Sequence, residues 1–248
     1  MKDIKNFTLV VGGLARDCEY NLNKNLKDVY RLRGEVKELF ICILENDSSD
    51  KTALVMDEFA KSHTNVIVKH FKETEFAVDN KTGASMSRIC RLAKYRNILL
   101  DLMDSCCPNP DYNVIIDWDL DEMNSLQILR AIENAPSNWG ALFADGRYKW
   151  QLCRKLQTGF RDKRKIYDSF AVLEDDKSIL SILPLDNTSY HKFIIAEKYG
   201  TLLNKNKYVS CNSAFGGIGI YKHEAIKGCK YTTTAIENWF VCEHISFH

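Results

Sequence analysis

Apolar runs and stretches with helical spacing alternate along the first half of the chain. The apolar runs, which predict buried strands, lie at 7–15, 38–44, 65–71 and 112–119. The stretches whose apolar residues recur at helical spacing, which predict helices, lie at 22–30, 51–63 and 85–106. Helical crossovers between strands imply a mostly parallel central sheet with helices on both faces. Ligands of such a sheet bind beyond the carboxyl ends of its strands.

The second half of the chain follows a different pattern. A further strand is predicted at 139–145, and the stretch 213–226 is strand-like and glycine-rich before it becomes helical. The total length of 248 residues suits a single large α/β domain.

Charge and composition exclude several classes of protein. The formal net charge of +1 gives no reason to expect a nucleic-acid partner. The apolar runs are too short to predict a transmembrane segment, and the polar N-terminus predicts no signal peptide. The nine cysteines are an odd number without the paired spacing of a zinc module, and several lie in apolar stretches. We therefore expect a reduced, cytoplasmic protein with buried thiols.

The segment "NVIIDWDLDE" at 113–122 drives a buried strand into four acidic residues. Carboxylates at the end of such a strand are typical ligands of Mg²⁺ or Mn²⁺. Asp119 belongs to both overlapping D-x-D patterns, and Asp117 and Asp121 compete for the second ligand position. Asp117 has the alternative of contacting a ribose hydroxyl. The competing interpretation is the acidic first turn of a helix that begins near Glu122.

Arg96 falls on the apolar stripe of the predicted helix at 85–106. A buried guanidinium needs a partner, so Arg96 is predicted to pair with a strand-end carboxylate such as Asp117 or to hold a phosphate. Arg88 is a further candidate for contacting the bound ligand. The alternative is that Arg88 lies on a solvated face of the helix. Asn97 is expected to support the site of Arg96.

The ends of the other strands supply further candidates. Gly13, together with Gly12, is predicted to let a ligand approach the backbone after the first strand, where Leu14 and Arg16 follow. Glu45 and Asp47 end the second strand and are candidates for accepting hydrogen bonds from a base or ribose. For these two residues, an ordinary polar turn is an equally good interpretation.

Seven segments of the chain, in their order along the sequence, resemble the corresponding segments of GT-A-type glycosyltransferases. They are "VVGGLARDCEYNL", "ILENDSSDKT", "RLAKYRN", "IIDWDLDE", "IYDSFAV", "SAFGGIGIYK" and "CEHISFH". The pattern is similar to the small transferases of large DNA viruses and of bacterial surface-polysaccharide loci, which are related to fungal capsule mannosyltransferases. The resemblance implies a Rossmann-like, mostly parallel sheet in one domain. It also implies a nucleotide-sugar-binding half at 1–122 and an acceptor-binding, catalytic half at 123–248.

The resemblance also implies a cofactor and its ligands. A Mn²⁺ or Mg²⁺ ion would bridge the protein and the diphosphate of the sugar nucleotide, and a histidine near the C-terminus would complete the metal shell. His244 and His248 are the two candidates, and on a helix they would share a face. A zinc site formed by these histidines and a carboxylate is the alternative.

The expected activity is transfer of a hexose from a UDP- or GDP-sugar to a hydroxyl of a glycan or glycoconjugate. Glu243 is the first candidate for the catalytic base and Asp168 the second. Asp145 follows a predicted strand and is a candidate for binding the donor sugar. Two alternatives stay open: a sugar nucleotidyltransferase, and a non-catalytic nucleotide-sugar-binding module of a larger polypeptide. The expected location is the cytoplasm, or the cytoplasm of the host cell if the protein is viral.

Overall fold

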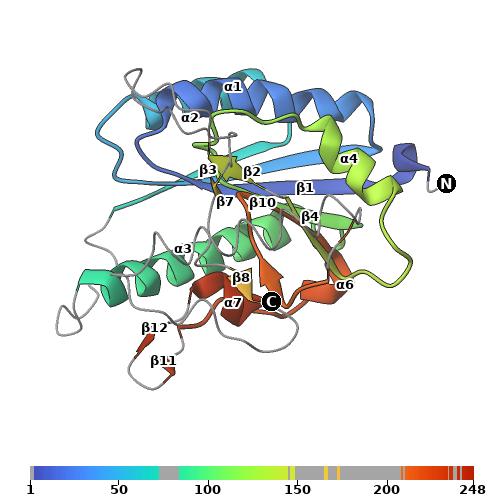
Figure 1. Ribbon diagram of the computed structural model, residues 1–248. Helices are drawn as coiled ribbons and strands as arrows, with labels where there is room; N and C mark the ends of the chain where they lie inside the picture. The colour runs from blue at the N-terminus through green and yellow to red at the C-terminus, as the bar shows by residue number, and fades with distance from the viewer. Residues whose placement is uncertain are drawn as a thin grey trace, which may run out of the picture. The chain divides into compact units, whose positions relative to one another are not determined.

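The computed structural model describes most of the N-terminal half of the chain and parts of the rest (Figure 1). The described residues are 3–72, 84–144, 146–148, 165–166, 172–173, 208, 210–233, 235–236, 239–240 and 242–248. The chain divides into two compact units. The first unit comprises Met1–Leu142 and Ile218–Tyr231, and the second comprises Phe143–Gly217 and Thr232–His248.

The first unit alternates strands and helices as the sequence predicts. Its strands are β1 (Thr8–Ala15), β2 (Glu38–Asn46), β3 (Val66–Phe71), β4 (Tyr112–Ile116) and β10 (Ile218–Lys222), and the boundary at Leu142 also gives it the first two residues of β5 (Ala141–Phe143). Its helices are α1 (Glu19–Tyr30), α2 (Thr52–Ser62), α3 (Ala84–Cys106), α4 (Leu126–Glu133) and α6 (His223–Ile226), with the 3₁₀ turns η1 (Ile4–Asn6) and η2 (Arg31–Gly34).

These strands form a six-stranded sheet in the order β3-β2-β1-β4-β10-β5. The pairs β1–β2, β2–β3 and β1–β4 are parallel, and β10 runs antiparallel to β4. The predicted fold class, α/β with a mostly parallel central sheet, is confirmed. The central strands β1 and β4 are nearly continuous runs of buried residues because helices cover both faces of the sheet there.

Side chains alternate between two layers along each strand. Leu9 and Val11 of β1 pack in the same core as Leu22 and Leu26 of α1. The helices α1, α2 and α4 lie on this face of the sheet, and α3 lies on the opposite face (Figure 1). Met103 of α3 contacts the position where a Cβ at Gly12 would lie, which places α3 against β1.

The boundaries of several elements differ from the prediction. Helix α1 begins at Glu19, with Cys18 at its N-cap position, and Asp17 lies before it in the left-handed region with φ 47°. Strand β4 ends at Ile116 rather than at Asp119. Helix α4 begins at Leu126, so Glu122 precedes the helix and is not a charge in its first turn. The acidic segment is therefore a loop between strand and helix.

Position 13 must be glycine for a structural reason that the sequence interpretation missed. It lies inside β1, which continues to Ala15. A Cβ at Gly13 would collide with the carbonyl oxygen of Ile116 and would lie 2.5 Å from Nε1 of Trp118. β4 and Trp118 therefore leave room only for glycine at this position, and the contact of Gly13 with a ligand stays a prediction.

The second unit contains short paired strands and a terminal helix. Its elements are β6 (Arg147–Tyr148), β7 (Lys165–Ile166), β8 (Val172–Leu173), β9 (Ser213–Ala214), β11 (Ala235–Ile236), β12 (Trp239–Phe240) and α7 (Glu243–Phe247). The pairs β6–β7, β8–β9 and β11–β12 are all antiparallel.

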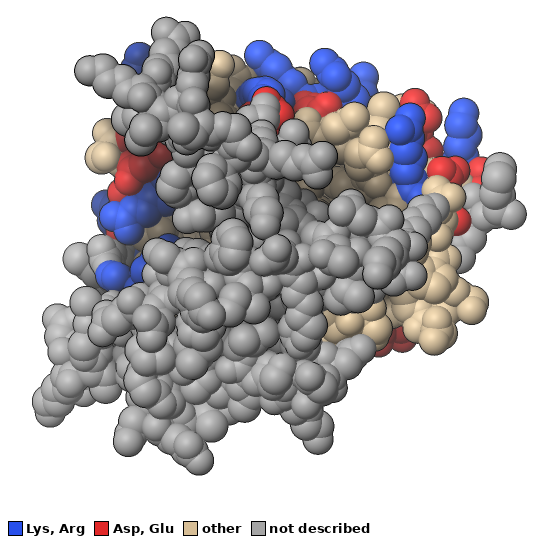
Figure 2. Space-filling view, viewed as in Figure 1, with Lys and Arg blue, Asp and Glu red and all other residues tan. Residues whose placement is uncertain are grey.

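Charged side chains of both signs share the described surface in Figure 2, where Lys and Arg stand among Asp and Glu. No large patch of one sign forms on the described part of that face, which agrees with the formal net charge of +1. No helix within the described ranges is both long and apolar enough to cross a bilayer.

Candidate functional site

The carboxyl ends of β1, β2 and β4 lie at one edge of the sheet because these strands are parallel neighbours. Three loops leave this edge: Arg16–Cys18 after β1, Asp47–Lys51 after β2, and the segment Asp117–Ser125 after β4. These loops contain Arg16, Asp47, Asp117, Asp119 and Asp121 among the charged residues that the sequence singles out. The edge is therefore the candidate site, at the position where open α/β sheets bind ligands.

The loops after β1 and β2 cap each other's helices. Oδ1 of Asp17 accepts hydrogen bonds from the backbone N of Ser49 at 2.6 Å and from its hydroxyl at 3.0 Å. The backbone N of Glu19 donates to Asp50, and the Glu19 carboxylate accepts from the backbone N of Lys51. These bonds satisfy amides at the starts of α1 and α2 that have no partner within their helices. The hydrogen bond from the Ser49 amide lowers the pKa of Asp17 below its ordinary value.

Helix α1 also fixes the path of the acidic segment. Nδ2 of Asn25 donates to the carbonyl oxygens of Trp118 at 3.0 Å and Leu120 at 2.8 Å. Nδ2 of Asn21 donates to the carbonyl oxygen of Asp119 at 2.8 Å. The sequence interpretation missed Asn25, although a signal was present: position 25 lies beside the stripe Leu22, Leu26 and Val29 and is buried. A polar residue there needs buried partners, by the same reasoning that singled out Arg96.

The three candidate metal ligands of the acidic segment differ in their surroundings. Asp119 and Asp121 are exposed, whereas the Asp117 side chain is 22% exposed. Asp121 accepts a hydrogen bond from Asn21 at 3.2 Å. Burial, together with the carboxylates of Asp119 and Asp50, raises the pKa of the Cys18 thiol to about 11.

No three His, Cys, Asp or Glu side chains among the described residues form a group that could hold a metal ion. The acidic segment is therefore not a closed, ready-made metal centre. Exposed carboxylates such as Asp119 and Asp121 still fit a hard divalent cation, because Mg²⁺ commonly binds through one or two carboxylates and completes its shell with water and phosphate oxygens.

Arg96 lies inside the protein as predicted, with 6% of its surface exposed. Its Nη2 is 3.6 Å from Oδ1 of Asp117, which confirms the predicted pairing. The guanidinium also lies 5.8 Å from the ring centroid of Tyr231. Asn97 holds that tyrosine through its backbone: Nδ2 donates to Tyr231 O, and Tyr231 N donates to Oδ1, both at 2.8 Å. Asn97 therefore supports the surroundings of Arg96, as expected.

A second group of polar side chains gathers around Tyr95, which the sequence interpretation did not single out. Nδ2 of Asn46, the last residue of β2, donates to the Tyr95 hydroxyl at 3.2 Å. Burial raises the pKa of Tyr95, Asp47 raises it further, and Arg91 and Arg16 oppose the rise. The predicted residues Arg16 and Asp47 thus both act electrostatically on the Tyr95 hydroxyl.

Arg88 is exposed in the first half of α3, and it is Arg91, rather than Arg88, that interacts with Tyr95. The spacing of four between Arg91 and Tyr95 places both on one helix face, which was the available sequence signal. Leu14 is half-buried within β1.

Glu45 takes part in the turn after β2. It is 5% exposed, and its Oε1 accepts from the backbone N of Ser48 at 2.6 Å. Its Oε2 lies 2.9 Å from Nδ1 of His70, whose Nε2 is 3.1 Å from Oδ1 of Asp57. Both oxygens of Glu45 thus already have partners in the protein. The structure favours the turn interpretation of Glu45 over a contact with a base or ribose.

The second unit contains the predicted C-terminal residues. His244 is buried and stacks on Phe215, with ring centroids 3.8 Å apart. His248 is exposed, and its Nδ1 lies 2.8 Å from the buried hydroxyl of Ser213. The helical alternative for this segment is confirmed, since α7 brings the two imidazole centroids within 5.8 Å. Glu243 begins α7 and is 4% exposed. Asp145 and Asp168 lie outside the described residues.

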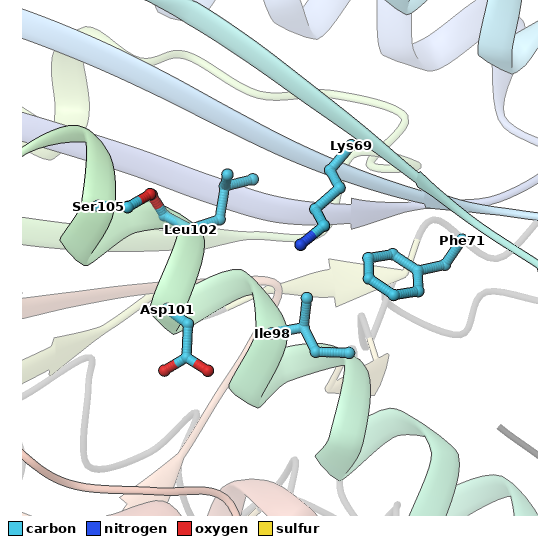
Figure 3. A pocket seen from close by; sticks show the side chains of 6 residues that line it. All are labelled: Lys69, Phe71, Ile98, Asp101, Leu102 and Ser105. Carbon is cyan, nitrogen blue, oxygen red and sulfur yellow. The ribbon is translucent and has the colours of Figure 1, made fainter. Parts of the chain in front are cut away.

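A cavity of about 420 Å³ opens between β3 and α3 of the first unit (Figure 3). Its wall is formed by Lys69, Phe71, Ile98, Asp101, Leu102 and Ser105. The Lys69 ammonium lies 4.9 Å from the centroid of the Phe71 ring, and Asp101 forms an ion pair with Lys230. None of these residues was predicted as a site residue.

No protein-family model matches the chain, and no curated protein matches it. Solved structures with partial similarity include a mannosyltransferase from Pyrobaculum calidifontis in complex with GDP-Man and Mn²⁺, at 15% identity and a TM-score of 0.40; the match covers 57% of this chain and 36% of that one. Glucosyl-3-phosphoglycerate synthase from Mycobacterium tuberculosis, in complex with UDP, has 16% identity and a TM-score of 0.36, with 58% and 46% covered. TarS 1-349 from S. aureus has 13% identity and a TM-score of 0.40, with 70% and 44% covered. The match spans less than half the length of each of these chains.

Proposed function

We propose that this chain is a metal-dependent glycosyltransferase of the GT-A type. It moves a hexose from a UDP- or GDP-sugar to a hydroxyl of a glycan or glycoconjugate acceptor. The observation that carries the proposal is the acidic loop at the carboxyl end of buried strand β4, held by α1 and joined by the inward-facing Arg96. The order of the seven GT-A-like sequence segments supports the same assignment.

The donor would bind at the carboxyl edge of the first unit. Asp119 and Asp121 present exposed carboxylates there and are the proposed ligands of Mn²⁺ or Mg²⁺. A divalent cation held by these carboxylates would supply Lewis-acid stabilisation of the charge on the diphosphate leaving group. Arg96 orients Asp117, which is proposed to contact the ribose, and adds positive charge beside the diphosphate. Arg16 and Asp47, gathered around Tyr95, are proposed to contact the nucleotide.

The residues of the second unit are proposed to act on the acceptor. Glu243 is the proposed base that takes the proton from the acceptor hydroxyl, and Asp168 is the second candidate. His244 and His248 are the two candidates for the histidine that completes the metal shell, and His248 is the exposed one. We propose the cytoplasm as the location, because the nine cysteines of the sequence lack the pattern of a secreted disulfide framework.

A thermal-shift screen of nucleoside diphosphates with and without Mn²⁺ tests the proposal. A ligand that binds the native state alone raises the unfolding temperature; at a concentration of about 100 Kd the stabilisation is about 2.7 kcal/mol. UDP or GDP should stabilise the wild-type chain more with Mn²⁺ than without it. Asp119→Asn should lose the Mn²⁺-dependent part. The control Asp104→Asn, which removes an exposed carboxylate from α3, should keep it.

The absence of a Mn²⁺-dependent shift with any nucleoside diphosphate, or a full shift in Asp119→Asn, would overturn the metal assignment. Turnover assays then separate the alternatives. Release of UDP or GDP from a sugar nucleotide in the presence of an acceptor indicates a transferase. Release of pyrophosphate from a nucleoside triphosphate and a sugar phosphate indicates a nucleotidyltransferase. Binding without turnover indicates a non-catalytic module.

A further inference from the structure

Two thiols from distant parts of the first unit face each other across the sheet–helix interface. Cys42 lies in the middle of β2, and Cys106 is the last residue of α3. Their sulfur atoms are 3.6 Å apart, with Cys42 donating its S–H toward Cys106. The two residues are 64 positions apart in the sequence. They belong to none of the groups assigned to the nucleotide-sugar site.

The alternation of β2 explains why Cys42 faces α3. Its neighbours Ile41 and Ile43 point into the core shared with α1 and α2, so Cys42 points to the opposite face. In the adjacent strand, Cys42 pairs with Gly12, over which Met103 of α3 packs. The last turn of α3 after Met103 then brings Cys106 to the sulfur of Cys42.

The two thiols differ in their access to solvent. Cys42 is 0% exposed, whereas Cys106 and its neighbour Cys107 are partly exposed. A reagent in solution therefore reaches Cys106 before it reaches Cys42. Cys106 is therefore the thiol that can attack a disulfide in solution, and Cys42 lies where it can attack the resulting mixed disulfide. Disulfide exchange requires these two steps in this order.

We propose that Cys42 and Cys106 form a reversible disulfide, a redox modification site in the first unit, when the protein meets a low-molecular-weight disulfide such as glutathione disulfide. The sulfurs must approach from 3.6 Å to about 2 Å, a shift that the end of a helix can supply. The proposal does not depend on the activity of the chain.

The exchange balances in two steps. The thiolate of Cys106 attacks glutathione disulfide, an S–S bond forms on Cys106, and one glutathione leaves as thiolate and takes up the proton that Cys106 released. The thiolate of Cys42 then attacks the sulfur of Cys106, and the second glutathione leaves and takes up the proton from Cys42. Two protein S–H groups are oxidised, and one glutathione disulfide is reduced to two glutathione molecules. Burial raises the pKa of the Cys42 thiol, so the second step should be the slower one.

Peptide mapping of the full chain tests the proposal. The protein is incubated with glutathione disulfide, free thiols are alkylated, and a tryptic digest is analysed without reduction. The expected product links peptide 38–51, which contains Cys42, to peptide 97–130, which contains Cys106. Because peptide 97–130 also contains Cys107, the same experiment on Cys107→Ser assigns the bond.

Variants of the pair give distinct outcomes. In Cys42→Ser, Cys106 should stay as the mixed disulfide with glutathione. In Cys106→Ser, the linked peptide should disappear and Cys42 should stay reduced. Cys229, which is exposed, reports that the oxidant is active by forming its own glutathione adduct. Circular dichroism checks that each variant is folded.

The linked Cys107→Ser protein should also unfold at a higher temperature than its reduced form, because the bond closes a long loop in the unfolded chain. The proposal is wrong if Cys229 is modified but no 42–106 link forms in the wild type or in Cys107→Ser. It is equally wrong if the bond found joins Cys106 to Cys107.

Discussion

The pair Arg96–Asp117 allows a quantitative test of how the candidate site is built. The proposed perturbations are Arg96→Met, Asp117→Asn and the double variant, studied as a double-mutant cycle. Arg96 and Asp117 are unequally buried, since their side chains are 7% and 22% exposed. Water can therefore replace Arg96 beside Asp117 more easily than it can replace Asp117 beside Arg96. We expect the two single changes to have different costs.

The magnitude follows from the distance between the charges. Unit charges 3.6 Å apart attract each other by about 5 kcal/mol at an effective dielectric constant of about 20. Loss of hydration of the guanidinium offsets much of this attraction. Asp117→Asn leaves a buried cation beside a neutral group and should cost about 3 kcal/mol. Arg96→Met leaves a carboxylate that water can reach and should cost about 1–2 kcal/mol, including its contact with Tyr231.

Urea unfolding followed by circular dichroism measures these differences through the midpoint at constant m-value. The double variant should be more stable than the sum of the single costs predicts, with a coupling of about 1–2 kcal/mol, because neither charge is left without its 3.6 Å neighbour. Equal costs for the single variants would refute the argument from unequal burial. Additive costs would show that the two charges, although 3.6 Å apart, do not stabilise each other.

Two further predictions concern packing and pH. Gly13→Ala should lower the free energy of unfolding in urea by about 3 kcal/mol, because the new Cβ meets the backbone of β4. Gly12→Ala should lower it by only about 1 kcal/mol, because its Cβ meets the Met103 side chain, which can move. Equal losses of stability would contradict this reasoning. Burial lowers the pKa of His70, but hydrogen bonds to Glu45 and Asp57 outweigh it and raise the pKa above 6.5. The stabilisation from His70 is thus complete below pH 6.5 and is lost as the pH rises through the raised pKa. The difference in the free energy of unfolding between the wild type and His70→Asn should therefore decrease across that range. A difference that does not change with pH would contradict this prediction.

The fold could be predicted because its central parallel strands β1 and β4 are buried on both faces. Such strands appear in sequence as continuous apolar runs, and the helices between them keep a clear period. The ends of the elements were predicted less well. Strand β2 continues through two polar residues to Asn46, because hydrogen bonds with β3 persist there. Helix α4 begins four residues after Glu122, because Asp28 of α1 holds the backbone N and hydroxyl of Ser125.

Parts of the candidate site could also be predicted, where chemistry conflicts with burial. Arg96 was identified because a charge on an apolar stripe needs a partner, and that partner is Asp117. Glu45 was ambiguous because a strand-end carboxylate serves a ligand or a turn equally well, and only the positions of Ser48 and His70 separate the two. Tyr95 could not be predicted as a site residue, because a tyrosine is unremarkable in a helix until Asn46 and the nearby charges are placed around it.

Asn25 links these observations because it determines where the acidic loop runs. Its single amide nitrogen supports two carbonyl oxygens, those of Trp118 and Leu120, on either side of Asp119. With both flanking carbonyls held, the backbone of Asp119 is fixed while its carboxylate stays exposed. Helix α1 is itself anchored by the reciprocal capping between Asp17 and the loop after β2. Asp119, the candidate metal ligand, thus owes its position to Asn25, a neutral residue of helix α1. The acidic residues can therefore be recognised in the sequence, whereas their arrangement cannot.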